Sequence, residues 1–260
     1  MKALVLAAGY ATRLQPLTDE VAKPLLPLAG RPMLDYLYEK IAAIDEVDRL
    51  HVVTNSRFAG DFRTWAERVE GPLALTVHDD GTTSNEDRLG AVGDIRFVLD
   101  RAGLEGEDLL VVAGDNLFEF DLRDFVAFWR SKGDGSAIGV HDVGDLELAR
   151  EYAVVELDED DRVTFLVEKP ERPTSTLAAI AVYLYRAEHA VLVERYLAEG
   201  NVPDQPGRFA AWLYSRAPLY GYRFPGEWLD IGNREQLLDA DNRMRERTGL
   251  SPRSEYSFEK

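Results

Sequence analysis

The chain has 260 residues, of which 45% are hydrophobic and 30% charged, so it can bury a large core within one domain. It has no Cys, which excludes disulfides, thiol catalysis and thiolate metal sites. The formal net charge of −17 argues against a duplex nucleic acid partner, because proteins that bind duplexes have basic faces. A run of about 18 apolar residues is absent and the chain begins directly with a strand pattern, so we expect no membrane association and a cytoplasmic location.

The acidic balance has two interpretations. It can serve solubility alone. It also suits a protein whose few basic motifs bind a small anionic substrate together with a divalent cation. Surface charges beyond about 8–10 Å are largely screened at physiological salt, so a few local cations can control a cleft.

Short β-rich apolar runs alternate with amphipathic stretches in the first half, which predicts a parallel doubly wound sheet. After residue 136 several strands follow one another, which predicts an added mixed-sheet region. Strands are predicted over residues 3–8, 50–54, 73–78, 109–113, 136–141, 153–157, 163–167, 178–185 and 219–224. Helices are predicted over residues 32–44, 58–69, 89–102, 122–131, 188–199, 208–215 and 234–247.

These elements predict an α/β fold, a Rossmann-like doubly wound mixed sheet with helices on both faces and a second, β-rich lobe. We expect a single domain over residues 1–247, divided at about residue 135, with the second lobe ending near residue 232. Residues 248–260 lack apolar periodicity and are expected to be frayed or loosely docked. In such sheets ligands lie at the carboxyl ends of strands, where residues 9–13, 79–88 and 114–116 fall.

Lysine is scarce, since only six of the 30 basic residues are Lys. Lys40 and Lys132 are predicted to be solvated charges at helix ends. Lys23 and Lys169 each precede a Pro, which biases the backbone towards an extended conformation. Lysine is a compact point charge that suits phosphate oxygens.

A second pattern joins the first predicted strand to a Gly turn that ends in Thr12 and Arg13. Free backbone N–H groups in such a turn, together with an Arg, form a phosphate cradle. The turn is neither a P-loop nor a dinucleotide-binding fingerprint, because GxxxxGK[ST] and GxGxxG are both missing.

Residues 6–27 resemble the sugar-1-phosphate nucleotidylyltransferase family, and the layout is closest to the glucose-1-phosphate thymidylyltransferases. The family hallmark is a strand, a Gly-rich turn ending in Thr-Arg, and a Lys-Pro pair ten residues later, here Lys23 and Pro24. Ala11 replaces the second Gly of many members, so we expect this turn to use a negative φ or an altered phosphate contact.

Two carboxylates follow apolar segments far apart in the chain. Asp115 follows the strand predicted over 109–113, where a carboxylate is costly unless a cation or hydrogen bonds compensate it. Asp230 precedes the last predicted helix. Taken alone, Asp115 can be a turn residue and Asp230 a cap or a dipole partner of that helix. The resemblance implies instead that both hold Mg²⁺, which requires oxygen ligands.

The resemblance also implies partners and roles. It implies a nucleoside triphosphate and a small phosphorylated acceptor as partners, Mg²⁺ as cofactor, residues 1–135 as the nucleotide-binding half and residues 136–232 as the acceptor-binding lobe, and it allows a homo-oligomer. Catalytic roles are implied for Arg13 and Lys23, and acceptor binding for Tyr152, Glu168 and Lys169. Nucleotide binding is implied for Leu6, Ala7, Ala8, Gly9, Thr12, Arg13, Asn85, Arg88, Gly90 and Gly114.

The implied reaction is Mg²⁺-dependent transfer of a nucleotidyl group, with dTTP or UTP favoured, to a sugar 1-phosphate, which gives an NDP-sugar and pyrophosphate. Ala153 and Ala181 stand where many sugar-specific members have Gly, and each methyl would approach a sugar ring. A non-sugar phosphate or phosphonate acceptor, such as phosphocholine or inositol phosphate with CTP, is therefore an alternative. A catalytically inactive nucleotide-sensing subunit is another.

The other functional residue types are predicted to be structural. The four His residues are scattered without a metal-binding pair. Three Trp residues on amphipathic helices, Trp65, Trp129 and Trp212, are expected to pack in the core. Trp228, beside Asp230, is the one Trp that can line a cleft.

Overall fold

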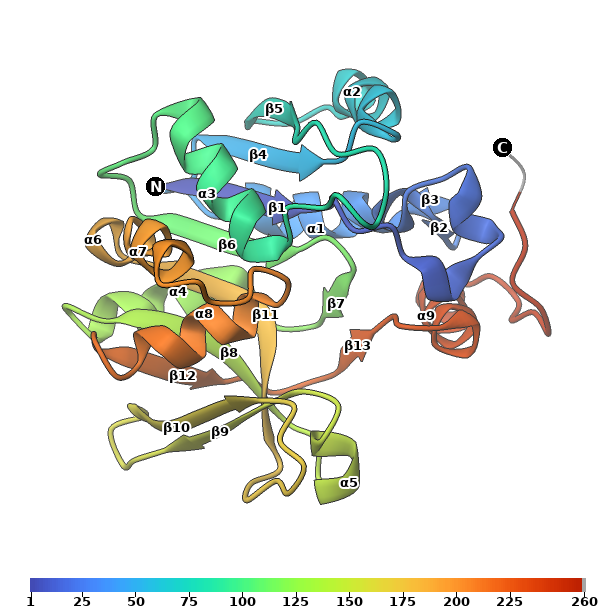
Figure 1. Cartoon of the computed structure of the whole chain (residues 1–260). Coiled ribbons are helices and arrows are strands. Elements are labelled where there is room, and N and C mark those ends of the chain that lie inside the picture. The colour runs from blue at the N-terminus through green and yellow to red at the C-terminus, as the bar shows by residue number, and fades with distance from the viewer. Residues whose placement is uncertain (259–260) are drawn as a thin grey trace.

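In the computed structural model, which describes residues 1–258, a nine-stranded mixed sheet forms the centre of the molecule (Figure 1). Its main path runs β10-β9-β11-β6-β1-β4-β5, and β8 and β12 extend it beyond β11. The neighbours β6, β1, β4 and β5 are parallel, which confirms the doubly wound α/β fold. The strands are β1 Lys2–Leu6, β4 Arg49–Thr54, β5 Ala74–Asp79, β6 Leu109–Ala113, β8 Ser136–Asp142, β9 Ala153–Leu157, β10 Val163–Glu168, β11 Leu177–Tyr185 and β12 Leu219–Arg223.

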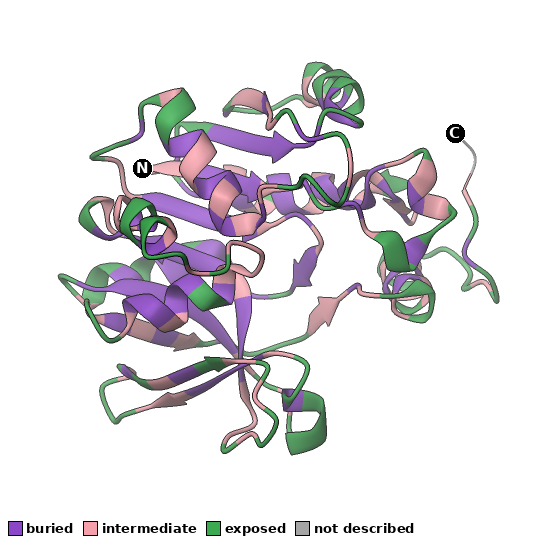
Figure 2. Ribbon diagram, viewed as in Figure 1, coloured by how far each residue is buried: buried purple, intermediate pink, exposed green. Residues whose placement is uncertain are grey.

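Helices cover both faces of this sheet because its parallel strands are apolar on both sides. Along β1, Ala3 and Val5 pack on one core with helices α1, α2 and α4, while Leu4 packs on the opposite core with α3, α7 and α8. Figure 2 shows the resulting buried strands between exposed outer helix faces. These helices are α1 Met33–Ala42, α2 Ala59–Arg68, α3 Ala91–Ala102, α4 Leu122–Ser131, α7 Leu192–Ala198 and α8 Pro206–Leu213. Within residues 1–258 no helix is long and apolar enough to cross a membrane.

The long strand β11 joins the two lobes. Its second half lies antiparallel to β6, with Val182 opposite Val112. Its first half pairs with β9, where Ala178 and Ala179 lie opposite Val154 and Ala153. The register of β11 against β8 shifts between these halves, and the β9–β10 hairpin therefore projects beyond the main sheet as a second lobe (Figure 1).

A third apolar cluster lies beside the main sheet and holds the segments that follow the Gly turn. It packs Leu14, Leu26 and Leu28 against Ile231 and Leu237. Its elements are β2 Pro27–Leu28, β3 Arg31–Pro32, β7 Asn116–Phe118, β13 Trp228–Asp230 and α9 Arg234–Arg247.

Of the two arrangements expected for the C-terminal segment, frayed or docked, the segment up to residue 258 takes the docked one and lies on this third cluster. The Tyr256 hydroxyl donates to the Pro27 carbonyl at 2.8 Å, and Arg253 Nε lies 2.7 Å from the buried Asp241 carboxylate. These individual contacts hold the segment in place without a helix or a strand, so its sequence needs no helical or strand periodicity. Residues 259–260 of the predicted tail lie outside the described residues.

Other differences from the predicted elements follow from length. The helix predicted over 188–199 is divided into α6, Ala187–Ala190, and α7. The elements β2, β3, β7, β13 and α5, Leu146–Ala149, were not predicted, because two to four residues are too few to show a hydrophobic period.

Two lysines predicted to be solvated have protein partners. Lys40 Nζ donates to the carbonyls of Glu119 at 3.0 Å and Phe120 at 2.9 Å, and burial lowers the pKa of Lys40. Lys132 Nζ donates to the Asp160 carbonyl at 2.7 Å and lies 3.2 Å from the Asp161 carboxylate. These partners are far away in the sequence and come close only in the folded chain, so no local sequence pattern could predict them.

The His residues are structural, as predicted, and two of them form a buried pair between β4 and β5. His51 Nδ1 lies 2.8 Å from His78 Nε2, and the rings stack with centroids 5.1 Å apart. Only one proton can lie between these two nitrogens, so at least one ring in the pair accepts. Burial, followed by the charge of His78, lowers the pKa of His51 to about 4.

We therefore expect this pair to destabilise the fold in mild acid. A His whose folded-state pKa lies below its ordinary 6.5 contributes stability above that pH, and the contribution is lost as the pH falls towards 4. The free energy of unfolding, measured by urea denaturation, should fall by about 1–3 kcal/mol over this range because of the pair. Replacing both residues by Val should remove this part of the pH dependence. An equal loss in the wild type and the double variant would contradict the prediction.

Candidate active site

A cavity of about 710 Å³ is lined by residues of both halves of the chain. It opens at the carboxyl ends of β1 and β6, where the parallel-sheet rule places ligands. The predicted site residues that line it are Leu6, Ala7, Ala8, Gly9, Thr12, Arg13, Lys23, Asn85, Arg88, Gly90, Asp115, Tyr152, Lys169 and Asp230. Segments far apart in the sequence thus meet at one cavity.

The Gly turn forms one wall of this cavity. Within the described residues, the backbone N–H groups of Gly9 to Thr12 donate no hydrogen bond, so they are available to an anion. Ala11 has φ 45° and ψ 44°, in the left-handed region. The expected negative φ is therefore wrong: the turn keeps the backbone conformation that Gly favours and accepts the steric strain of a methyl group.

Lys23 crosses from this turn to the end of β6. Its Nζ lies 2.6 Å from Asp115 Oδ2, and the residue is 9% exposed. The next residue, Pro24, packs against the backbone of Gly114, where an added Cβ would lie 3.0 Å from Pro24 Cγ. Gly114 itself does not line the cavity, so its visible role is to allow this close approach rather than the expected nucleotide contact.

Two short strands bring the second carboxylate to the first. In the antiparallel pair β7–β13, Asp230 lies opposite Asn116, and thus next to Asp115. Burial raises the pKa of Asp230, the negative charge of Asp115 raises it further, and the charges of Lys23, Arg13 and Lys169 lower it. Because all four side chains act on one carboxylate, they lie close together in the folded chain.

Two of these cations form no salt bridge with any of the described residues. Arg13 and Lys169 make no hydrogen bond or ion pair through their side chains within residues 1–258. Lys169 also has a positive φ of 48°, a strained conformation for a residue with a Cβ, and its N–H donates to the Tyr152 carbonyl at 3.0 Å. The strained backbone and the unpaired charges both concentrate at this cavity, as expected where a polyanion binds.

The two other predicted acceptor residues behave differently. Tyr152 lines the cavity, and burial, then the charge of Asp230, raise its pKa to about 12. Glu168 lies outside the lining, and its carboxylate faces α8, where a Cβ added to Gly207 would lie 2.2 Å from Glu168 Oε2. In this conformation Glu168 packs against a helix instead of facing the expected sugar hydroxyls. Burial raises its pKa.

Several lining residues were missed by the sequence analysis. Leu148 and Glu151 come from a short helix and its end, and Asp204 forms a 3.0 Å ion pair with Arg88 from the opposite side. Asp94 is an acidic residue in the first turn of α3, a place where helix-dipole effects usually suffice to explain it. Trp228 does not line this cavity. It donates to Asn116 Oδ1 at 2.7 Å and packs with its ring edge on Tyr152.

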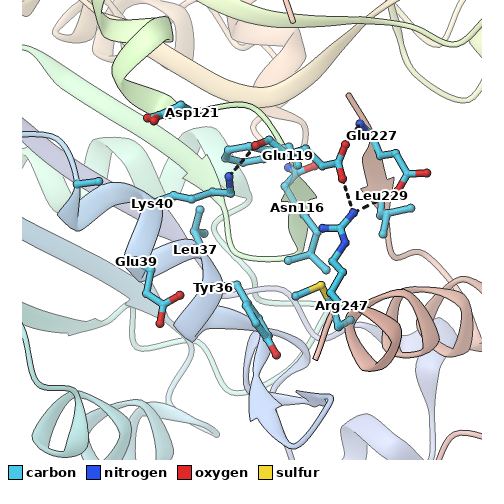
Figure 3. Close-up of a pocket in the computed structure, with 14 residues that line it drawn as sticks. Tyr36, Leu37, Glu39, Lys40, Asn116, Glu119, Asp121, Glu227, Leu229 and Arg247 are labelled. Atoms are coloured by element: carbon cyan, nitrogen blue, oxygen red, sulfur yellow. Dashed lines mark hydrogen bonds and ion pairs between the residues drawn. The ribbon is translucent and has the colours of Figure 1, made fainter. Parts of the chain in front are cut away.

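A smaller cavity of about 380 Å³ lies on the other side of β7 and β13, among α1 and the end of α9 (Figure 3). The Asn116 side chain turns into it, whereas the neighbouring Asp115 lines the larger cavity. Its basic side chains are occupied: Lys40 donates to backbone carbonyls, and Arg247 pairs with Glu119 and Glu227. We therefore place the active site in the larger cavity, which has the unpaired cations.

Asp115 and Asp230 form a donor set that fits Mg²⁺. Burial, followed by the negative charge of Asp115, raises the pKa of Asp230, and a divalent cation between the two carboxylates would offset both effects. Within the described residues no group of three or more His, Cys, Asp or Glu converges on one point. Two carboxylates with the remaining positions left for phosphate oxygens and water are the usual arrangement for Mg²⁺.

The fold and this cavity define a Rossmann-like α/β protein in which free backbone N–H groups, cations and carboxylates meet at the carboxyl ends of parallel strands. The profile of the family described as nucleotidyl transferase matches residues 2–247. The chain belongs to that family.

Two relatives are named for the same acceptor, glucose 1-phosphate, and for different nucleotides. The chain is 26% identical over 257 residues to a glucose-1-phosphate adenylyltransferase of Clostridium novyi, which covers 93% of this chain and 66% of the relative. It is 28% identical over 243 residues to a UTP–glucose-1-phosphate uridylyltransferase of Synechocystis, with 89% and 60% covered. The chain thus spans less than two thirds of the length of both relatives.

A solved structure shows the same fold. A Bacillus anthracis protein provisionally described as a glucose-1-phosphate thymidylyltransferase, in complex with a sucrose, has a TM-score of 0.78. It is 22% identical, and the match covers 100% of this chain and 98% of that chain.

The strain at Ala11 leads to a prediction about stability. A left-handed backbone destabilises a residue with a Cβ by about 1–2 kcal/mol. Gly avoids this cost, but part of the gain is offset because Gly also increases the conformational entropy of the unfolded chain. We expect Ala11→Gly to raise the free energy of unfolding by about 1 kcal/mol in urea denaturation. Ala22→Gly, at a residue with φ −59°, is the control and should destabilise. A loss of stability in Ala11→Gly would contradict the strained turn.

Proposed function

We propose that this protein catalyses Mg²⁺-dependent transfer of a nucleotidyl group from a nucleoside triphosphate, with dTTP or UTP favoured, to a sugar 1-phosphate. The observation that carries the proposal is that Arg13 and Lys169, which form no salt bridge within the described residues, line the cavity that also contains Lys23, Asp115 and Asp230. The names of the relatives support a sugar 1-phosphate as acceptor.

In this reaction an oxygen of the acceptor phosphate attacks the α-phosphorus, and the bond from that phosphorus to the β-phosphate oxygen breaks. Pyrophosphate leaves with the electron pair of that bond. A phosphate monoester has a second pKa near about 6, so it is already largely dianionic at neutral pH and needs no strong general base. This agrees with a cavity where no His is among the lining residues.

Catalysis then depends on position and charge. Arg13 and the free N–H groups of Gly9 to Thr12 would stabilise the departing pyrophosphate. Lys169, which lines the same cavity from the second half of the chain, would orient the acceptor phosphate. Lys23 would contact the phosphates that lie between them. Asp115 and Asp230 would hold Mg²⁺, which supplies charge neutralisation at the phosphate oxygens when it is bound.

Removing either member of the central ion pair should abolish most turnover and leave the fold intact. We expect Lys23→Ala and Asp115→Asn each to lower kcat/KM for pyrophosphate release by about 100-fold or more. Lys132→Ala is the matched control, because Lys132 lines neither cavity and pairs with Asp161. Far-ultraviolet circular dichroism and thermal unfolding report folding. Pyrophosphate release near the wild-type rate by a folded Lys23 or Asp115 variant would refute the assigned roles.

A non-sugar acceptor is the second candidate, and one contact favours it. Ala181 lines the cavity, so its methyl group occupies space on the acceptor side. Ala153 is buried and lies instead against the backbone of α8, near Gly207, so it supplies no such restriction. One methyl group is weaker support than the pair that the sequence suggested.

A matrix of the four ribonucleoside triphosphates and dTTP against phosphorylated acceptors, read by mass spectrometry of the products, tests both candidates. We expect an NDP-sugar from a hexose 1-phosphate, with dTTP or UTP the most effective. Product formed only with phosphocholine, inositol phosphate or a phosphonate would establish the second candidate. Nucleotide binding without product from any pair would show a nucleotide-sensing subunit.

A further inference from the structure

Two carboxyl groups, of which Asp94 is buried and Asp80 half-buried, face each other at the base of the loop that precedes α3. Asp80 follows the end of β5, and Asp94 lies in the first turn of α3. Asp94 is 5% exposed and belongs to the cavity lining. The reaction proposed above uses neither residue, and both are expensive to bury as ions.

The hydrogen bonds require a proton between the two side chains. Asp80 Oδ1 accepts from the Thr82 N–H at 2.7 Å and from the Thr82 hydroxyl at 2.8 Å. Asp80 Oδ2 and Asp94 Oδ1 are both buried and have no donor within the described residues. The side chains of Asp80 and Asp94 nevertheless hydrogen-bond to each other, and this bond lowers the pKa of Asp80 and raises that of Asp94. Two ionised carboxylates cannot do this, so one of them carries a proton and donates it to the other.

This contact joins the two ends of one loop. The loop runs from Asp80 to the start of α3 and contains Asn85, Arg88 and Gly90, the predicted nucleotide-binding residues. From Asp80 the network continues through Thr82, whose hydroxyl lies 3.2 Å from the Tyr10 hydroxyl in the Gly turn. A change in the protonation of the carboxyl pair can therefore alter the positions of both the loop and the Gly turn.

Within residues 1–258 no cation forms a salt bridge with either carboxyl group of the pair. The charge that acts on Asp94 is that of Asp80, and Asp79 adds a further negative charge at Asp80. At the far end of the network the pKa of Tyr10 is raised, mainly by burial. The charges of Asp87 and Asp80 raise this pKa further, and the charge of Arg57 lowers it. Many basic side chains of the neighbouring elements have other partners: Arg57 with the Asp19 carbonyl, Arg63 with Asp79, Arg88 with Asp204, Arg96 with Asp100 and Glu194, Arg195 with Glu199, Arg208 with Gln205, and His51 with His78. Arg101, at the far end of α3, acts on His78.

We propose that the proton shared by Asp80 and Asp94 fastens the nucleotide-binding loop at its base, so that affinity for the nucleoside triphosphate falls when this proton leaves. Asp94 is thus a positioning residue that acts through the loop. The inference rests on the proposed function, since it assumes that the loop binds a nucleotide.

Burial, followed by the charge of Asp80, raises the pKa of Asp94 to about 8, so the proton is present at neutral pH and leaves in mild alkali. The raised pKa of Asp94 also makes the free energy of unfolding depend on pH. A carboxyl whose folded-state pKa lies above its ordinary 3.8 contributes stability that is complete below that pH and is lost as the pH rises through about 8. An Asn at position 94 would donate a similar hydrogen bond without this penalty, so it should stabilise the unliganded protein at pH 7.5.

The test measures binding of Mg²⁺-dTTP, UTP, CTP, ATP and GTP by calorimetry at pH 7 and pH 9, without acceptor. For whichever triphosphate binds at pH 7, the wild-type Kd should rise about tenfold by pH 9, since one linked proton changes affinity at most tenfold per pH unit above its pKa. Asp94→Asn should bind within about threefold of the wild type at pH 7 and lose the alkaline rise. Asp94→Leu, which cannot donate, should bind weakly at both pH values and raise KM for the triphosphate more than it lowers kcat.

The outcomes separate the inference from the function on which it rests. No binding of any triphosphate at pH 7 would overturn both. Binding that is equally tight at pH 7 and pH 9 in the wild type would overturn the inference alone, as would an unchanged alkaline rise in Asp94→Asn. If Asp94→Asn fails to fold, Asp80→Asn replaces it, because its amide can donate to the Asp94 carboxylate and should equally flatten the profile. Thermal unfolding at each pH confirms that the protein is folded.

Discussion

The site depends on compensation between charges that the fold holds close together, and the ion pair between Lys23 and Asp115 is at its centre. This contact ties the segment after the Gly turn to the end of β6. The pairing of β13 with β7 then adds Asp230, whose pKa is raised by burial and by the charge of Asp115. Arg13 and Lys169, which form no salt bridge within the described residues, line the same cavity. A bound polyanion and a divalent cation would complete the balance that the protein leaves open.

Rigid surroundings make this arrangement possible. Arg13 and Lys23 lie in short 3₁₀ turns, and the residues beside them, Leu14 and Leu26, are anchored in the third apolar cluster with α9. The docked C-terminal segment covers that cluster through Tyr256. Strained left-handed backbone at Ala11 and Lys169 persists because neighbouring contacts determine it, and both residues flank the cavity. The buried carboxyl group of Asp94, next to the loop that contains Asn85 and Arg88, is a further group whose burial lowers the stability of the fold at this cavity.

The strong periodic segments made the fold predictable. All nine predicted strands are present, because each is an apolar run of five or more residues, and the helix over 122–131 was predicted to the residue. The Gly turn and the Lys-Pro pair also identified one wall of the cavity, which Gly9, Thr12, Arg13 and Lys23 line. The errors concern direction and conformation. Glu168 was assigned to the acceptor, but its side chain packs on α8, and Gly114 makes room for Pro24 instead of lining the cavity.

The sequence by itself determined the order of strands and helices, the family and the chemical types of the site residues, since hydrophobic period and motif spacing are local properties of the chain. Tertiary structure alone decided which charges remain unpaired, which way Glu168 points, and that Asp80 and Asp94 share a proton. The physical reason is that burial and pairwise electrostatic interaction depend on distances of a few ångströms between residues remote in sequence. Those distances exist only once the chain is folded.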